Sequence, residues 1–197
     1  MSLTGKWINL VYRVATGDWK TKLLFAPIVG LFYLGLISCF ILMSFVVDRS
    51  LHLPRISCSP WNQFAGGLVV AFGLFLMLLS VSYFVRARGT PVPLSPPPKL
   101  VIVGPYRFVR NPMLTGIFIQ LFGLGFFFGS ISLLFIFTPL FIVINVWELK
   151  KVEEPELMKR LGKDYAEYRE RVPMFFPLQT SPVRKTLGEG LGRSGLR

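Results

Sequence analysis

The chain has 197 residues, of which 52% are hydrophobic and 16% charged, with a formal net charge of +12. A soluble domain of this length carries more charge and interrupts its apolar segments more often, so the composition excludes an ordinary soluble protein. The fold class it predicts is an all-α integral membrane domain. Because the basic residues flank long apolar segments, a membrane surface explains their charge better than nucleic acid does.

Few side chains in this sequence suit metal or acid–base chemistry. Cys39 lies within an apolar segment, and Cys58 shares a loop with His52, the only histidine. This spacing fits neither a metal site nor a disulfide. We therefore expect no metal and no histidine-based catalysis.

The first predicted element is a short interfacial segment over residues 1–22, where Trp7 and Trp19 are placed to anchor at the lipid headgroups. This stretch lacks the pattern of a cleavable signal peptide. Two apolar segments follow over residues 23–85. Leu23–Val47 and Phe64–Val85 are each long enough to cross a bilayer at ~1.5 Å per residue.

Two further apolar segments, Met113–Phe128 and Ile131–Trp147, are separated only by Gly129-Ser130. So short a connection predicts an antiparallel helical hairpin, with a kink at Pro139. Each segment is slightly short for a ~30 Å hydrocarbon core. The sequence thus predicts about four transmembrane helices, ending in a C-terminal helical hairpin that amphipathic cytoplasmic helices follow.

The basic residues predict how these helices are oriented. With four spans, both termini and loop 86–112 lie on one side, which then carries 20 of the 22 Lys and Arg residues, while Arg49 and Arg55 lie on the other. The positive-inside rule places the basic side in the cytoplasm of an inner or plasma membrane.

The segments outside the spans differ in character. Residues 91–98 hold five prolines, which favour an extended polyproline conformation. After residue 147 an amphipathic helical track returns. We expect Pro155 at a helix start, Gly162 at a helix end and a capping box at Asp164 and Glu167. Residues 86–177 form the predicted core domain, and residues 178–197 a disordered basic tail.

The motif GPYRFVRNPMLTG at residues 104–116 carries the first candidate site residues. Gly104 permits close backbone approach, and Tyr106 can stack on an aromatic ligand. Arg107 and Arg110 can bind a carboxylate, helped by the helix N-terminus that Asn111 and Pro112 begin. Anchoring at the membrane interface is the alternative explanation for the tyrosine and arginines.

The second candidate group is the acidic pair Glu153 and Glu154. These carboxylates can accept hydrogen bonds from an ammonium group or from ribose hydroxyls. Alternatively they neutralise the lysines and arginines beside them on a solvated helix face. Together with the arginine motif on the same membrane face, they suit a small zwitterion with several hydroxyls.

The pieces GPYRFVRNPMLTG, a helical hairpin, EEPEL, LGKDYAEY and VPMFFP follow one another between residues 104 and 177. This order resembles membrane methyltransferases of the isoprenylcysteine carboxyl methyltransferase and phospholipid N-methyltransferase type. The match covers roughly residues 86–177. Asn111 stands where the carboxyl methyltransferases usually have His, which resembles the phospholipid-methylating and bacterial branches more closely.

The resemblance implies S-adenosylmethionine as cofactor and a lipophilic or lipid acceptor that enters from the bilayer. By position it implies a cofactor site with these members: Gly104, Tyr106, Arg107, Arg110, Asn111, Pro112, Met113, Glu153 and Glu154. Methyl transfer from a sulfonium is an in-line displacement, which relies on positioning and desolvation. Arg110 is the candidate to orient an acceptor and Glu154 the candidate to take a proton, as catalytic residues.

Two alternatives remain open from the sequence. One is an NADPH-dependent membrane enzyme resembling sterol reductases. The other is a non-catalytic membrane scaffold that binds anionic lipid through its basic tail. The sequence leaves the methyl acceptor and the oligomeric state unassigned.

Overall fold

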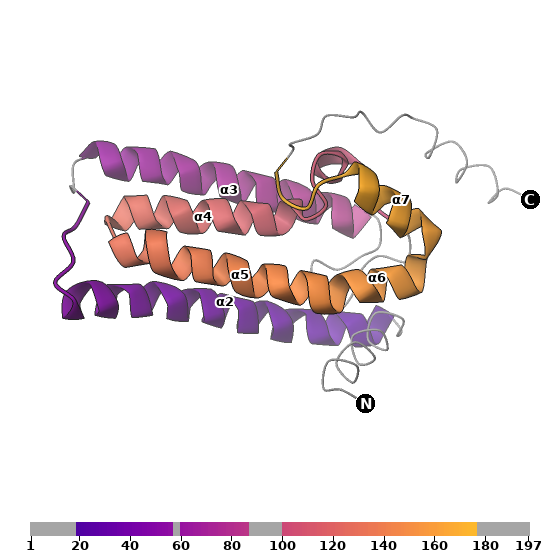
Figure 1. Cartoon of the computed structure of the whole chain (residues 1–197), viewed down its shortest axis with the longest axis horizontal. Helices are drawn as coiled ribbons and strands as arrows, with labels where there is room; N and C mark the ends of the chain where they lie inside the picture. The colour runs from indigo at the N-terminus through magenta and orange to yellow at the C-terminus, as the bar shows by residue number, and fades with distance from the viewer. Residues whose placement is uncertain (1–18, 57–59, 87–99, 177–197) are drawn as a thin grey trace, which may run out of the picture.

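The computed structural model describes residues 19–56, 60–86 and 100–176. Within these ranges every regular element is a helix (Figure 1). Three helical segments are long and apolar enough to cross a membrane, namely Gly30–Ser50, Pro60–Phe84 and Leu133–Leu161, and Pro112–Phe128 is a shorter apolar helix. The all-helical membrane fold is confirmed, while the count of four crossings stays a prediction.

The helices are longer than the apolar segments that predict them. The elements in chain order are α2 (Trp19–Ser50), α3 (Pro60–Arg86), η1 (Gly104–Arg107), α4 (Pro112–Phe128), η2 (Leu133–Phe137), α5 (Thr138–Glu148), η3 (Leu149–Glu153), α6 (Glu154–Leu161) and α7 (Lys163–Arg171). The last predicted span does not end at Trp147, because η2, α5, η3 and α6 form one helical run that continues to Leu161. Charged residues lengthen this run without breaking it, since they are good helix formers.

Two wide turns interrupt that helical run, and each precedes a proline. Thr138 N–H donates to the carbonyl of Leu133, and Glu154 N–H to that of Leu149, so both turns are π-helical. Pro139 and Pro155 follow these turns directly at the start of α5 and α6. A proline ring clashes with the carbonyl four residues earlier in an α-helix, and the extra residue of a π turn relieves that clash. The kink predicted at Pro139 takes this form.

Glycines bring α3 and α4 together, backbone against backbone. A Cβ on Gly73 would lie 2.6 Å from the carbonyl oxygen of Gly116, and one on Gly66 would lie 2.8 Å from that of Gly123. Small residues at matching intervals allow such close approach between membrane helices. Figure 1 shows α3 and α4 lying side by side along their length.

The other seam joins α2 to the long helical run. The core there consists of Phe118, Leu121 and Phe141, against which several α2 side chains pack. The ring of Phe40 on α2 meets Phe137 and Phe141 edge to face, at centroid distances of 5.8 and 5.7 Å. Aromatic packing of this kind fixes how α2 lies along η2 and α5.

A polar cluster closes the bundle at the turn after α4. Gly129 has a φ of 63°, the left-handed conformation that ends α4, and its carbonyl accepts from Ile56 N–H at 3.1 Å. The carboxylate of Asp48 accepts from the Ser130 hydroxyl at 2.5 Å and from Ser132 N–H at 3.0 Å. A residue from α2 therefore caps the helix that begins beyond this turn.

At the opposite end, the chain turns at Gly162 from α6 into α7. Gly162 has a φ of 56° and is the N-cap of α7, with no side-chain cap bond. The capping box predicted at Asp164 and Glu167 is therefore wrong, because α7 already begins at Lys163. The interfacial segment up to residue 18, the proline-rich loop over 87–99 and the basic tail from 177 lie outside the described residues.

Candidate functional site

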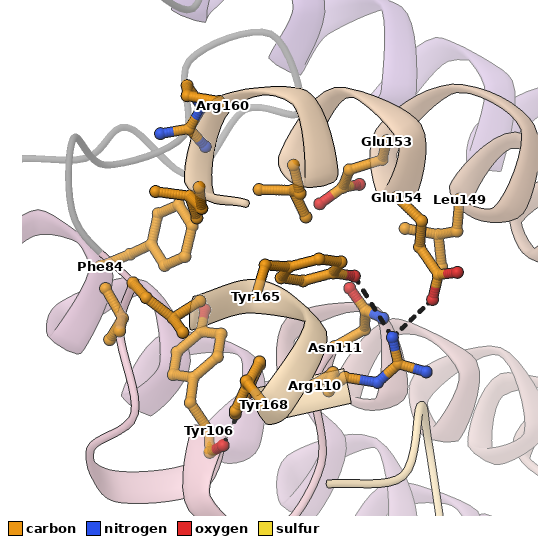
Figure 2. A pocket seen from close by; sticks show the side chains of 14 residues that line it. Phe84, Tyr106, Arg110, Asn111, Leu149, Glu153, Glu154, Arg160, Tyr165 and Tyr168 are labelled. Atoms are coloured by element: carbon orange, nitrogen blue, oxygen red, sulfur yellow. Dashed lines mark hydrogen bonds and ion pairs between the residues drawn. The ribbon is translucent and has the colours of Figure 1, made fainter. Parts of the chain in front are cut away.

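A pocket lies at the end of the bundle where α6 and α7 meet the segment before α4 (Figure 2). Its walls come from three separate parts of the chain, namely the end of α3, residues 100–111 and residues 149–168. The lining residues are Phe84, Leu100, Val101, Tyr106, Arg110, Asn111, Leu149, Glu153, Glu154, Leu157, Arg160, Leu161, Tyr165 and Tyr168. The two sequence motifs predicted to cooperate thus line one cavity.

Arg110 joins the two motifs directly. Its Nη1 donates to Glu154 Oε1 at 2.5 Å and to the Tyr165 hydroxyl at 3.2 Å. Only 11% of the Arg110 side chain and 14% of the Glu154 side chain are exposed, so solvent screens this ion pair little. Arg110 Nε is buried and has no hydrogen-bond partner among the described residues. The guanidinium therefore retains a donor for a further acceptor.

Backbone bonds hold Arg110 and Asn111 in place. Arg110 N–H donates to the carbonyl of Pro173 at 2.9 Å, and Asn111 N–H to that of Met174 at 3.1 Å. The segment that follows α7 thus runs beside the segment that precedes α4. Asn111 is the N-cap of α4 by position, but its side chain makes no cap bond and lines the pocket instead.

The two carboxylates of the acidic pair have different surroundings. Glu154 faces Arg110 and also has Arg169 Nη1 at 3.8 Å from its second oxygen. Glu153 lines the pocket and forms no hydrogen bond or ion pair with the described residues. Both glutamates stand at the junction of η3 and α6, where the π turn changes the angle between successive side chains.

Aromatic side chains form the wall opposite the acidic pair. The rings of Phe84 and Tyr106 lie 5.5 Å apart between centroids, tilted by 31°. The Tyr168 hydroxyl donates to the Tyr106 carbonyl at 2.7 Å, which ties α7 to η1. Burial, followed by the charge of Glu154, raises the pKa of Tyr165 to about 12, and burial raises the pKa of Tyr106 as well. Both hydroxyls are therefore neutral at physiological pH and can donate.

A second arginine approaches the pocket from α6. Arg160 Nε donates to Glu156 Oε1 at 2.9 Å, and the Glu156 side chain is only 1% exposed. Figure 2 shows Arg160 and Arg110 at opposite ends of the cavity, with Glu153 and Tyr165 between them. The cavity therefore has guanidinium groups at its two ends and carboxyl groups along one side.

The structure places five of the nine predicted cofactor-binding residues in this lining: Tyr106, Arg110, Asn111, Glu153 and Glu154. Gly104 is outside it, and its φ of 58° serves a close approach to the Tyr83 ring, which a Cβ would meet at 2.5 Å. Arg107 is exposed, Pro112 is buried at the start of α4, and Met113 is half-buried. Some residues of the motif therefore position the chain, and others line the cavity.

Sequence reasoning did not assign Phe84, Arg160, Tyr165 or Tyr168 to the site. Part of this set could have been found from the sequence, because Tyr165 and Tyr168 belong to the amphipathic track predicted after residue 147. Five members of that track line the cavity, namely Leu149, Leu157, Leu161, Tyr165 and Tyr168. The inward face of this track is therefore a pocket wall as well as a core.

One of the comparisons with known proteins found a matching protein family. The family model described as phospholipid methyltransferase matches residues 61–164, which is 104 of the 197 residues. No curated protein and no solved structure matches the chain significantly. The matched region runs from the start of α3 to the start of α7 and includes Tyr106, Arg110 and both glutamates of the acidic pair.

Proposed function

Because the chain belongs to the phospholipid methyltransferase family, we propose that it is an S-adenosylmethionine-dependent enzyme that methylates a lipophilic acceptor from the bilayer. Family membership supports a membrane methyltransferase. The cofactor and the acceptor are parts of the proposal. The observation that carries it is the cavity in which Arg110, Glu153 and Glu154 meet.

The charges around the cavity fit the cofactor's amino-acid part. Arg110 keeps a buried Nε without a partner, and a carboxylate is the group that a guanidinium binds best. Glu153 has no hydrogen-bond partner among the described residues, so its oxygens suit an ammonium group or ribose hydroxyls. A zwitterion bound in this way satisfies groups that otherwise stay unpaired in a partly buried site.

The aromatic wall fits the cofactor's flat part. Phe84, Tyr106 and Tyr165 offer ring faces or edges to the cavity, and stacking on such rings stabilises a bound heterocycle. The Tyr165 hydroxyl oxygen accepts from Arg110, which leaves its own proton free to donate to the ligand.

When bound, the cofactor supplies a methyl group on a positively charged sulfur. The chain's residues then have to hold that group in line with the acceptor and keep water out, which contributes several kcal/mol. Glu154 is engaged by Arg110 and approached by Arg169, so we assign it to positioning Arg110. The proton-accepting role predicted for Glu154 fits Glu153 better, because Glu153 has no hydrogen-bond partner among the described residues.

We also propose that the site lies on the cytoplasmic side of an inner or plasma membrane. In its favour, the helices that surround the pocket carry many of the chain's basic residues, such as Lys150, Lys151 and Lys159, as the positive-inside rule requires. No observation on the described residues favours a reductase or a scaffold.

The test is calorimetric binding of S-adenosylmethionine to the purified full chain in detergent, with NADPH as the comparison ligand. We expect binding of S-adenosylmethionine and weaker binding after Glu154→Gln, because this substitution frees Arg110 from its position. Absence of binding by folded wild-type protein refutes the proposal. Transfer of a labelled methyl group into total membrane lipids then identifies the acceptor.

A further inference from the structure

A second, open cavity lies at the far end of the bundle from the candidate active site. It is formed by the end of α2, the chain that follows α2, and the turn between α4 and η2. The residues that line it are Phe45, Asp48, Arg49, His52, Leu53, Arg55, Phe128, Gly129 and Ser130. None of these residues lies near the methyltransferase pocket.

The charged residues that line this cavity are two arginines and one aspartate, so their formal charge is positive. Asp48 is the one carboxylate in the lining, and both of its oxygens accept bonds from Ser130 and Ser132. Arg49 and Arg55 are exposed, and their guanidinium groups form no hydrogen bond or ion pair with the described residues. Two arginines therefore line the cavity, and their guanidinium donors have no acceptor among the described residues.

The backbone brings these two arginines to the same cavity. The chain leaves α2 through bonds from Leu51 N–H to the Val47 carbonyl and from Leu53 N–H to the Asp48 carbonyl, both 2.9 Å. His52 has a φ of 50°, a left-handed conformation that a non-glycine residue adopts at a cost of ~1–3 kcal/mol. The turn reverses the chain, so that Arg55 lines the cavity that Arg49 also lines.

The rest of the cavity is apolar. The rings of Phe45 and Phe128 meet edge to face at 5.2 Å between centroids, and Phe127 packs on Phe128 at 5.3 Å. These rings are partly exposed, as is Val46 beside them at 53%. The cavity thus combines two partly exposed aromatic rings with two arginines in its lining.

We propose that this cavity binds the headgroup phosphate of an anionic phospholipid, whose acyl chains lie along Phe45 and Phe128. Guanidinium groups bind phosphate oxygens through two parallel hydrogen bonds. The partly exposed rings of Phe45 and Phe128 offer apolar surface to the acyl chains. The bound lipid holds the end of α2 against the α4–η2 turn. This site is independent of the methyl-transfer reaction.

The experiment is photo-crosslinking in the cavity itself, because other basic residues also attract anionic lipid. The full chain carries Leu53→p-benzoylphenylalanine and is placed in bilayer discs of phosphatidylcholine with or without phosphatidylglycerol of the same acyl chains. Mass spectrometry then counts the lipid adducts. We expect phosphatidylglycerol to be labelled about tenfold more often than its share of the bilayer, since two arginines favour it.

The arginines are tested by Arg49→Gln with Arg55→Gln in the same background. We expect this double variant to lose the preference, whereas Lys150→Gln with Lys151→Gln, which removes equal charge at the other end, retains it. Labelling in proportion to bilayer composition overturns the proposal, as does a preference that survives the arginine substitutions. Thermal unfolding of each variant confirms that it is folded before labelling. Suppression by excess inorganic phosphate would assign the site to free phosphate instead and overturn the lipid.

Discussion

The two ends of the long helical run from η2 to α6 each carry a polar cluster, and the clusters differ in how completely their groups are paired. At the start of the run, both oxygens of Asp48 are hydrogen-bonded to Ser130 and Ser132. At its end, Glu154 is paired with Arg110, but Glu153 and Arg110 Nε have no hydrogen-bond partner among the described residues.

This difference in pairing suggests different roles for the two clusters, namely stability for the paired one and ligand binding for the other. Buried polar groups are normally satisfied, and a satisfied cluster stabilises one arrangement of helices. Unpaired groups beside a cavity carry a desolvation cost that a ligand of opposite charge can offset. We therefore expect substitutions at Asp48 to affect stability, and substitutions at Arg110 and Glu153 to affect binding.

The largest expected effect comes from the glycine seam on which both ends depend. Gly73→Val places side-chain atoms against the backbone of α4, since a Cβ alone already lies 2.6 Å from the Gly116 carbonyl oxygen. We expect a loss of about 3 kcal/mol or more in unfolding free energy, measured by thermal unfolding in detergent. Gly67→Val is the control on the same helix, because nothing lies within 4 Å of its Cβ position. Equal stability of the two variants contradicts the packing described.

Arg110→Ala is expected to have the largest effect on binding. It removes the group that joins the two motifs and leaves Glu154 largely buried without its closest partner. We expect the affinity for S-adenosylmethionine to fall about 100-fold, and stability to fall as well, because breaking a buried pair is costly. The matched control is Arg107→Ala, an exposed arginine of the same motif outside the cavity. Equal loss of affinity in both variants, measured by calorimetry, rules out the assignment.

Glu153→Gln tests the unpaired carboxylate. We expect about a tenfold loss of affinity for the cofactor, in keeping with one hydrogen bond to a charged group. The midpoint of thermal unfolding should stay unchanged, because Glu153 loses no hydrogen bond or ion pair within the described residues. Glu170→Gln, at an exposed position on α7, is the matched control for the same change of residue outside the cavity. A drop in stability without a change in affinity argues against a binding role.

Asp48→Ala addresses the opposite end and should have the smallest effect on function. We expect about 1–2 kcal/mol of lost stability, because Ser130 and Ser132 N–H lose their acceptor, and unchanged cofactor affinity. Asp164→Ala serves as the control, since Asp164 is an exposed acidic residue that does not cap its helix. A large loss of cofactor binding in the Asp48 variant would show that the two ends of the helical run are coupled and do not have separate roles.

Several features of the fold and site are predictable from local patterns. Apolar length predicts the helices, and Gly129 between two apolar segments predicts the end of α4. The charge pattern predicts that the arginine motif and the acidic pair share one end of the molecule, which the contact between Arg110 and Glu154 confirms. The resemblance to membrane methyltransferases is confirmed by the family match, while its bacterial branch stays a prediction.

Other features depend on contacts between distant residues, which local sequence patterns do not predict. Nothing local in the sequence pairs Asp48 with Ser130, because 82 positions separate them. The close approach of α3 and α4 at Gly73 and Gly116 likewise depends on how two helices meet. The expected capping box at Asp164 fails because Gly162 ends α6 and begins α7 with a single residue.

The amino-acid sequence determined that this protein is a helical membrane protein and indicated which motifs hold the candidate site residues, because hydropathy and charge act locally along the chain. Tertiary structure decided which members of those motifs reach the cavity. In the folded chain Gly104 lies against the Tyr83 ring and Arg107 is exposed. Tyr165 and Arg160 line the cavity. These outcomes depend on packing between distant segments, which makes Glu153 and Glu154 unequal although they are adjacent in the chain.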